Sequence, residues 1–372
     1  MGTLLLSVSN LAKPALVAGA SALCLAMLLV LTRRWHGRFS MDTHGGIQKF
    51  HTDPTPRIGG VAVFGGLICA YAVAPISLQS LLGPMLLAGI PAFAFGLLED
   101  ITKNVSVGTR LLATMFCGVV GWAITGFSLT RVNVPGLDWM LGYTIVSLGF
   151  TAFAVGGVAN AINIIDGFNG LASGTAIVIL CGFAALSWSV GDVTFAYLCL
   201  VLAGATCGFF LLNWPFGKLF LGDGGAYFLG FALAWTAVLF LARHPQVSAW
   251  QVLLVCAYPI LEVCFSVLRR RRRGLSPGAP DRLHLHSLVK QRLVRQRFSQ
   301  RSNLWRNSAT GILMCCVSAV PVVVALALPA DNFPMAIGLF LCAGAYWLVY
   351  ARLSQFHWCL GAAAPKCPVP TP

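Results

Sequence analysis

The sequence predicts an all-α membrane protein, a helical bundle that crosses a lipid bilayer about eleven times. Of its 372 residues, 58% are hydrophobic and only 10% are charged, whereas soluble domains carry about 25% charged residues. Apolar stretches of about 18 to 21 residues recur along the chain, and each has the length of a helix that spans a hydrocarbon core. Barrel strands would instead show about ten residues of alternating hydrophobicity. Lipid is therefore the solvent for most of the chain.

The candidate spans predict one membrane domain over 1–352 and a short, disordered cytoplasmic tail over 353–372. The first span continues to Thr32 and stops at Arg33 and Arg34, which favours an uncleaved span over a secretory signal peptide. The candidate spans are 12–32, 58–77, 80–98, 109–128, 139–159, 171–190, 194–213, 224–243, 248–268, 308–328 and 334–352.

The basic residues predict the orientation of these spans. If eleven helices cross the membrane, alternate connecting segments share a side, and nearly all Lys and Arg residues lie in or beside the segments of one side. The exceptions are Lys13, Arg131 and Arg243. Because cytoplasmic loops are enriched in Lys and Arg, we expect the N-terminus outside and the C-terminus inside. The predicted cytoplasmic loops of the active site are 33–57, 99–108, 160–170, 213–223 and 269–307.

The net charge of +14 does not by itself predict nucleic-acid binding. The most basic run, Arg269 to Arg273, directly follows a candidate span, where basic side chains contact anionic lipid headgroups. We expect contact with membrane lipid and no nucleic-acid partner. The 13 cysteines are scattered and lack the paired spacings of a zinc site, so we expect them to be small apolar packing residues.

Acidic residues gather on the predicted cytoplasmic side, and three Gly-rich segments place them at a membrane border. A carboxylate at that depth is costly unless it is paired or bound to a cation. A single loop Asp is more often a cap or a turn residue, but three such segments favour a site for Mg²⁺, with Mn²⁺ as the alternative. The segments are Gly96 to Asp100, Asn160 to Gly174 and Leu221 to Gly225.

Basic side chains of the same side predict that the ligand is a phosphate or a diphosphate. Guanidinium and ammonium groups are the usual partners of phosphate oxygens. The candidates are Arg57, Lys103, Arg110, Lys218 and Arg282.

Two histidines, His284 and His286, follow Pro-Asp-Arg in the most basic loop. In an extended segment, alternate side chains point to one side, which favours a pair of phosphate donors or a proton shuttle over solvated loop histidines. A zinc site is disfavoured because no third soft ligand is close in sequence. Glu262 lies inside a candidate span, where an acid is a functional candidate; pairing with a basic residue of the site and a structural role remain open alternatives.

These loops resemble the polyprenyl-phosphate N-acetylhexosamine-1-phosphate transferase superfamily, which includes bacterial undecaprenyl-phosphate GlcNAc-1-phosphate transferases of glycosyltransferase family 4. The resemblance extends from about His51 to Ser287 and rests on four motifs in order. Glu99-Asp100 resembles the family's Asp-Asp pair, Asn160 to Gly174 its Asn-x-x-Asn-x-x-Asp-Gly loop, Gly222-Asp223-Gly224 its Gly-Asp-x-Gly motif, and His284-Leu-His286 its His-rich loop. Eleven spans with the N-terminus outside favour the O-antigen-initiating branch over the ten-span peptidoglycan branch.

The resemblance implies transfer of a sugar 1-phosphate from a UDP-N-acetylhexosamine to undecaprenyl phosphate, with release of UMP, at the inner membrane of a bacterium. By this resemblance, Asp223 and Asp166 hold Mg²⁺, and Glu99, Asp100, Asp166 and His284 are catalytic. Asn163, Asn169 and His286 join the five basic candidates in binding substrate.

Three positions depart from the family pattern. Glu99 stands in place of Asp, Asn169 in place of a second Asp, and Ser287 in place of a further His. The central acids are retained, so the departures affect chiefly the roles of Glu99 and Asn169, and they disfavour a peptidoglycan-type substrate.

An alternative function is a transporter or flippase for a phosphorylated lipid or an organic anion. Such a protein would use the same basic cleft without chemistry, but its spans should carry charged residues along the path. Apart from Glu262, the spans contain almost none. The sequence leaves open which sugar is used, which polysaccharide is made, whether the reaction has one step or two, and whether the chain forms a homo-oligomer.

Overall fold

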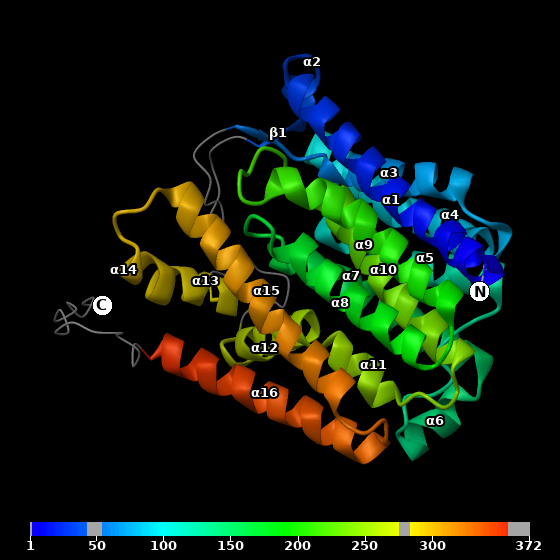
Figure 1. The fold of residues 1–372 in the computed structure, drawn as a ribbon. Helices are drawn as coiled ribbons and strands as arrows, with labels where there is room; N and C mark the ends of the chain where they lie inside the picture. Colours follow the sequence, from blue (N-terminus) through cyan, green and yellow to red (C-terminus); the bar gives the residue numbers. More distant parts are fainter. Residues whose placement is uncertain (1, 43–53, 275–282, 356–372) are drawn as a thin grey trace.

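The computed structural model describes residues 2–42, 54–274 and 283–355 and shows a bundle of long helices (Figure 1). The β-structure in these ranges is one antiparallel pair of two-residue strands. The elements are α1 (Gly2–Leu31), α2 (Arg33–Ser40), β1 (Met41–Asp42), β2 (Thr55–Pro56), α3 (Gly59–Val73), α4 (Ile76–Thr102), α5 (Val107–Thr125), α6 (Pro135–Leu141), α7 (Thr144–Ile165), α8 (Leu171–Ser189), α9 (Val193–Asn213), α10 (Gly222–Arg243), α11 (Ala249–Val255), α12 (Ala257–Arg272), α13 (Leu285–Val289), η1 (Lys290–Val294), α14 (Arg295–Arg297), α15 (Asn303–Ala327) and α16 (Asn332–Ser354). The predicted all-α membrane bundle is confirmed.

Nine of the described helices are long and apolar enough to cross a membrane, and the bent pair α11–α12 would make a tenth. Helix α3, in the candidate span 58–77, has only 15 residues. Each candidate stretch thus contains a helix, but the count of eleven crossings stays a prediction. Helix α1 begins at one end of the bundle and α16 ends at the other (Figure 1), as an odd number of crossings requires. Which end faces the cytoplasm also stays a prediction.

The helix borders differ from the expected loops around the acidic motifs. Helix α7 runs to Ile165, because the separate helix α6 precedes it and shifts the span toward the C-terminus. Asn163 therefore lies on the last turn of α7, Asp100 on the last turn of α4, and Asp223 in the first turn of α10. The predicted loop boundaries were wrong at these three places. The acids stand on helix ends, whose directions are fixed more firmly than those of loops.

The predicted span 248–268 is two helices, α11 and α12, that meet at an angle of 81°. The break falls at Cys256, and Pro259 follows three residues later. A proline has no N–H to donate to the carbonyl four residues before it, and its ring clashes with that carbonyl. That carbonyl belongs to Val255, the last residue of α11, so the proline accounts for the end of the first helix. The bend carries Glu262 into the protein, where it is buried.

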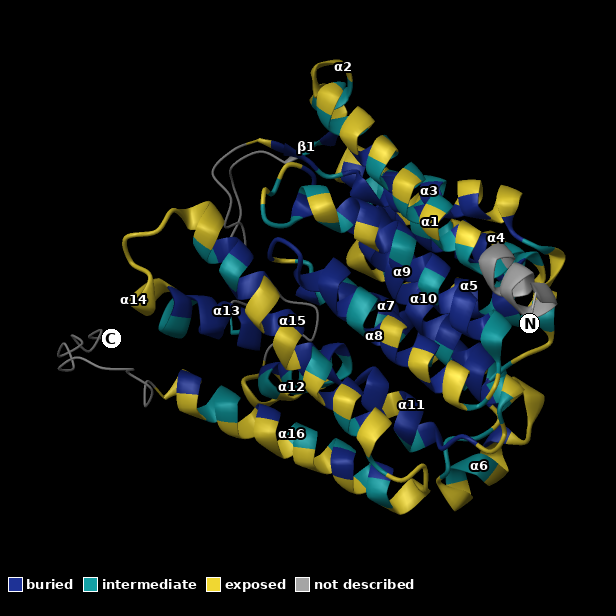
Figure 2. Ribbon diagram, viewed as in Figure 1, coloured by how far each residue is buried: buried dark blue, intermediate teal, exposed yellow. Residues whose placement is uncertain are grey.

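Helix α10 lies at the centre of the bundle and is buried on nearly all sides (Figure 2). Between Asp223 and Arg243 it carries no charge, as expected for a helix with no face toward water. Helices α3, α4, α5 and α7 pack around it. Glycines allow the closest approaches: a Cβ at Gly96 of α4 would lie 2.6 Å from backbone atoms of Asp223. Such small-residue contacts are typical of helix pairs in membranes.

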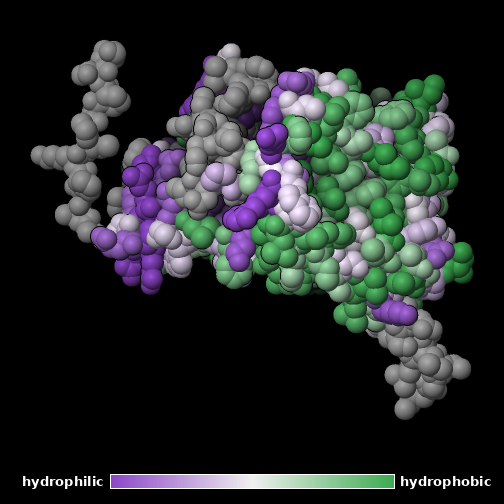
Figure 3. Space-filling model, turned by 90° about the horizontal axis from the view of Figure 1, so that it is seen from above, coloured by the Kyte–Doolittle hydropathy of each residue, from purple (hydrophilic) through white to green (hydrophobic). Residues whose placement is uncertain are grey.

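The surface is strongly divided. Hydrophilic side chains gather at the end of the bundle near α13 and α14, and hydrophobic side chains cover most of the remaining visible surface (Figure 3). The first turn of α10, with Asp223, lies at the same end as this hydrophilic surface (Figure 1). The polar site is therefore built where the helices end, beside an apolar belt.

The contact at Gly96 predicts a stability difference between two helical glycines. Gly96→Ala should destabilise the protein by about 1–3 kcal/mol, because the added methyl group meets backbone atoms that cannot move aside. Gly149→Ala on α7 is the matched control, since a Cβ there meets no atom within 4 Å, and it should be neutral or slightly stabilising. The measurement is the Tm of both variants in the same detergent. Equal Tm values would contradict the close packing of α4 on α10.

Candidate active site

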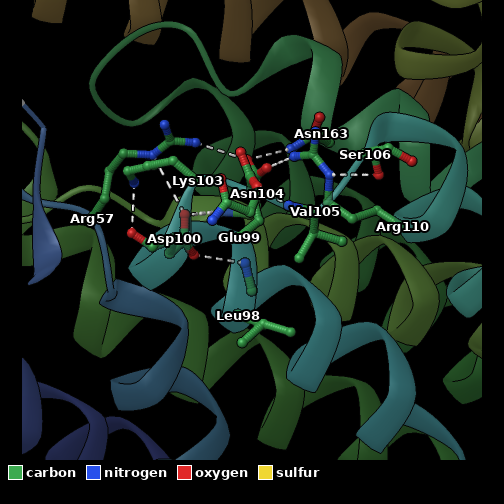
Figure 4. Close-up of polar contacts among 12 residues, drawn as sticks. Arg57, Leu98, Glu99, Asp100, Lys103, Asn104, Val105, Ser106, Arg110 and Asn163 are labelled. Carbon is green, nitrogen blue, oxygen red and sulfur yellow. Dashed lines mark hydrogen bonds and ion pairs between the residues drawn. The ribbon is translucent and has the colours of Figure 1, made fainter.

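The carboxylate of Asp100 caps the N-terminus of α10 from a neighbouring helix. Its Oδ1 accepts the backbone N–H of Asp223 at 2.9 Å, and its Oδ2 accepts that of Gly224 at 2.9 Å (Figure 4). The first N–H groups of a helix have no partner within the helix, and they favour a negative charge. Asp100 is fully buried, so these bonds also satisfy a carboxylate that could not otherwise remain there. Both of its oxygens are thereby engaged.

Gly222 makes this cap possible. Its φ of +76° is in the left-handed region, which residues other than glycine rarely adopt. A Cβ there would lie 2.1 Å from the carbonyl oxygen of Arg57 and 2.5 Å from Oδ2 of Asp100. The glycine of the Gly-Asp-Gly motif thus lets three chain segments meet.

The segment around Arg57 is attached to the entry of α10 by backbone hydrogen bonds. The N–H of Phe220 donates to the carbonyl of Pro56, and the N–H groups of Gly59 and Gly60 donate to Phe220 and Leu221, all at 2.8 Å. These bonds place the guanidinium of Arg57 between two acids. Its Nη2 lies 2.8 Å from Oδ1 of Asp223, and its Nε lies 3.5 Å from Oδ1 of Asp100.

Asp223 is the centre of a charged cluster. Besides Arg57, its Oδ1 accepts a hydrogen bond from Nδ2 of Asn163 at 3.0 Å, and its Oδ2 forms an ion pair with Arg110 (Figure 4). The Arg110 guanidinium also lies over the ring of Tyr227, 5.6 Å from its centroid. Helices α4, α5, α7 and α10 and the segment before α3 therefore contribute to one site. This is the convergence that the sequence motifs predicted.

Asp166 differs from the other two acids because no described residue donates a hydrogen bond to its carboxylate. It stands at the C-cap of α7, half-buried. Burial raises the pKa of Asp166 to about 7, although the positive charge of Arg57 opposes the shift. At neutral pH this carboxyl can therefore either accept a proton or bind a cation.

Glu99 and Lys103 shape the turn after α4. Oε2 of Glu99 accepts the N–H of Val105 at 2.7 Å, and Nζ of Lys103 donates to the carbonyl of Asp100 at 2.5 Å. Lys103 itself has a φ of 59°. The Lys103 side chain is exposed, and that of Glu99 is partly exposed, so both can be reached by a ligand.

The pair His284 and His286, called the histidine wall below, lies beside the residues that follow Asp166. The rings of His284 and His286 are parallel, with centroids 5.2 Å apart, and His286 meets the ring of Phe168 edge-on at 5.4 Å. The prediction that the two side chains lie on the same side is confirmed, although the pair begins a short helix instead of lying on an extended segment. Nδ1 of His284 lies 3.0 Å from Oε1 of Glu262. Glu262 therefore has a described partner in His284, which is compatible with both alternatives.

Two predicted substrate-binding residues are not brought into the acid cluster, and the structure does not describe a third. Asn169 is buried, and its Nδ2 donates to Oγ of Ser308 at 3.1 Å, which ties the loop after α7 to α15. Lys218 is exposed, with its ammonium 5.1 Å from the ring of Phe216. Arg282 lies outside the described residues.

Lys290 lies close to the histidine pair, although the sequence did not predict it as a site residue. It is buried, and its ammonium lies 5.2 Å from the centroid of the Phe168 ring. Burial and the nearby Arg306 lower the pKa of Lys290 to about 8. Its spacing of four residues from His286 would place both on one helical face, but many basic residues nearby obscured this signal.

Comparison with known proteins supports the resemblance to the transferase superfamily. The model of glycosyl transferase family 4 matches residues 82–241, which include Asp100, Asp166 and Asp223. A probable undecaprenyl-phosphate N-acetylglucosaminyl 1-phosphate transferase of Bacillus subtilis is 27% identical over 64% of this chain and 66% of its own length. Undecaprenyl-phosphate α-N-acetylglucosaminyl 1-phosphate transferases of Yersinia pestis and Escherichia coli K12 are 28% and 25% identical, over 65% and 71% of this chain and 67% and 72% of their own lengths.

These matches support the polyprenyl-phosphate N-acetylhexosamine-1-phosphate transferase superfamily as the family that the chain resembles. The resemblance inferred from the four motifs is thereby confirmed, and the long apolar helices indicate a multi-pass membrane protein. The family match ends before His284 and His286, so the placement of the histidine wall rests on this structure.

The oxygen donors around Asp166 and Asn163 fit Mg²⁺. No residue in the described ranges donates a hydrogen bond to the Asp166 carboxylate. Asn163 uses its Nδ2 toward Asp223, which leaves its carbonyl oxygen for a cation. In the described ranges, no three acidic, histidine or cysteine side chains lie close enough to hold an ion by themselves. Mg²⁺ usually takes one or two protein carboxylates and completes its shell with water and substrate phosphates. The residues therefore fit an ion that is shared with a substrate.

The Asp166 environment predicts a carboxyl that titrates near neutral pH. The infrared band of the protonated carboxyl, obtained by subtracting the spectrum of Asp166→Asn, should disappear with a midpoint of about pH 7. Because the folded-state pKa is raised, the neutral carboxyl favours folding. This stabilisation is complete below 3.8, the ordinary pKa of Asp, and is lost as pH rises through about 7.

Arg57→Gln should raise this midpoint further, because Arg57 is the cation that lowers it. Arg352→Gln is the control, since Arg352 is an exposed arginine near the end of α16, and it should leave the midpoint unchanged. A wild-type midpoint close to 3.8 would contradict the described surroundings of Asp166.

Proposed function

We propose that the protein transfers N-acetylhexosamine 1-phosphate from a UDP-sugar, UDP-GlcNAc first among them, to undecaprenyl phosphate, and so starts a cell-surface polysaccharide. An oxygen of the lipid phosphate forms a bond to the β-phosphorus of the UDP-sugar. The bond from that phosphorus to the bridging oxygen breaks, and UMP leaves. The product is a lipid diphosphate that carries the sugar. We place the reaction at the cytoplasmic face of the bacterial inner membrane.

The observation that carries this proposal is the cluster of Asp100, Asp223, Arg57 and Arg110 at the hydrophilic end of the bundle. Phosphoryl transfer depends mainly on positioning and on neutralising charge. A site between an apolar belt and a hydrophilic surface can admit a lipid acceptor from one side and a soluble nucleotide from the other. The names of the relatives, which are undecaprenyl-phosphate sugar-1-phosphate transferases, support the same substrate class.

The two arginines would bind the diphosphate of the UDP-sugar. Arg57 and Arg110 now neutralise Asp223, and phosphate oxygens can compete for both guanidinium groups. A bound diphosphate would then take the guanidinium groups of Arg57 and Arg110 away from Asp223, and the Asp223 carboxylate would have fewer hydrogen-bond donors.

Asp166 is the candidate for moving a proton. A general base works best when its pKa is close to the working pH, and the raised pKa of Asp166, about 7, meets this condition. It would take a proton from the lipid phosphate and so increase the negative charge on the attacking oxygen. Asp100 has both oxygens engaged by backbone N–H groups, so we assign it a role in positioning Asp223. Glu99, at the exposed edge, would align the lipid phosphate.

The histidine wall would contact the diphosphate from the opposite side. His286 is buried, and burial lowers its pKa to about 4, so it is neutral at pH 7. His284 and His286 would act as hydrogen-bond donors and acceptors, and Arg282 would add a positive charge.

Asp223 and Asn163 would hold Mg²⁺, with Mn²⁺ as a substitute. Asp166 is the alternative or additional carboxylate ligand, and it would bind the ion only while it is ionised and is not taking up a proton. When bound, the ion would neutralise the charge that develops on the diphosphate and the departing UMP.

The test is release of UMP by the purified protein from UDP-GlcNAc with undecaprenyl phosphate and Mg²⁺. Asp223→Asn should lower the rate about 100-fold or more, because it removes a charged group at the centre of the site. Asp192→Asn is the control, since Asp192 pairs with Arg243 and His244 at the C-terminal end of α10, away from the site. It should leave the rate unchanged.

If both variants release UMP at the wild-type rate, the proposed reaction is supported, but the proposed role of Asp223 is contradicted. If no UDP-N-acetylhexosamine gives UMP, and labelled UMP does not exchange into UDP-sugar in the presence of lipid phosphate, the proposed reaction is wrong. Uptake of a phosphorylated lipid or anion into proteoliposomes would then support the transporter alternative.

A further inference from the structure

Glu262 is a buried acid that lies outside the charged cluster around Asp223. It is 1% exposed and stands on α12, after the bend at Cys256. An ionisable group in such a place is expensive. A neutral side chain could fill the same volume without this cost, so packing alone does not explain an acid here. The partners of Glu262 indicate its role.

Two hydrogen bonds join Glu262 to the start of α13. Its Oε1 accepts the backbone N–H of Leu285 at 2.9 Å and lies 3.0 Å from Nδ1 of His284. An ionised carboxylate offers only acceptors, so the proton of a neutral His284 must be on Nδ1. Nε2 of His284 is then left with a lone pair. One carboxylate oxygen therefore fixes both the backbone of this segment and the tautomer of its first histidine.

The ring of His284 packs against the ring of His286. The two rings are parallel within 5°, and the edge of His286 rests against Phe168. A Cβ at Gly167, the residue after Asp166, would lie 3.8 Å from Nε2 of His286. A chain of contacts thus runs from Glu262 through the two histidines to the residues that follow Asp166.

We propose that Glu262 is a positioning residue, which holds His284 in the Nδ1–H tautomer and holds both imidazoles against the Asp166 segment. The effect on turnover rests on the proposed transfer reaction, whereas the tautomer is a property of the protein alone. In metal sites, carboxylates accept the ring N–H of a histidine in the same way and fix its tautomer, and their loss typically lowers metal affinity or activity 10- to 100-fold.

The test combines kinetics with the ¹⁵N spectrum of the histidines. Protein labelled with ¹⁵N-histidine should show His284, assigned by its loss in His284→Asn, as the Nδ1–H tautomer. In Glu262→Gln, the side-chain amide can donate or accept, so both tautomers should become populated. The kcat of UMP release should fall about 10- to 100-fold, with a much smaller change in KM for UDP-GlcNAc, since the ring pair remains but its orientation is lost.

Two further variants separate positioning from folding. Cys264→Ser changes an exposed residue of the same helix and should keep both the tautomer and the kcat. Glu262→Asp retains a carboxylate on a shorter side chain, and it should restore more of the Nδ1–H tautomer and of the kcat than Glu262→Gln does.

An unchanged His284 tautomer in Glu262→Gln overturns the proposal, and so does a changed tautomer with wild-type kcat. If wild-type protein released no UMP from any UDP-sugar, the proposed function would fail. The ¹⁵N spectra would still decide whether Glu262 sets the tautomer.

Discussion

The hydrogen bonds from the entry of α10 to the carboxylate of Asp100 are the interaction on which the site depends. Helix α10 is buried on nearly all sides, so its first N–H groups cannot rely on water, and a partner must come from the protein. Asp100 supplies that partner from the end of α4. Because both oxygens are used, the direction of α10 and the position of Asp223 are fixed together. The absence of a side chain at Gly222 then allows the Arg57 segment to approach the same point.

This arrangement divides the work among three acids that look alike in sequence. Asp100 is buried and accepts two backbone N–H groups, Asp223 is surrounded by cations and an amide, and Asp166 has no donor among the described residues. The first holds the entry of α10, the second can exchange its partners, and the third can bind a proton or a cation. The differences arise from neighbours and burial, since the side chains are chemically identical.

Much of the fold could be predicted because a lipid bilayer requires spanning helices of a limited length and an apolar composition. Each apolar stretch gave a helix, and the three central acids converge as their Gly-rich borders suggested. The helix ends could not be predicted, because Asn160 to Ile165 suit a helix end as well as a loop, and only packing decides between them. The bend before Pro259 was missed because the apolar run continues through it. Asn169 is used to attach a loop to Ser308 of α15, a contact 139 residues away in sequence that no local pattern shows.

The bend also explains why an acid inside an apolar stretch is compatible with membrane insertion. On a straight span, Glu262 would need a partner on a neighbouring helix at its own depth. The 81° turn redirects α12, so its second turn meets the start of α13, whose backbone N–H and imidazole satisfy the carboxylate. The pairing couples the helix that follows the bend to the histidine wall. Phe168 and Gly167 in turn couple that wall to the end of α7. The two halves of the site, one built on α4 and α10 and the other on α12 and α13, are therefore joined at the residues around Asp166, whose carboxylate has no hydrogen-bond donor among the described residues.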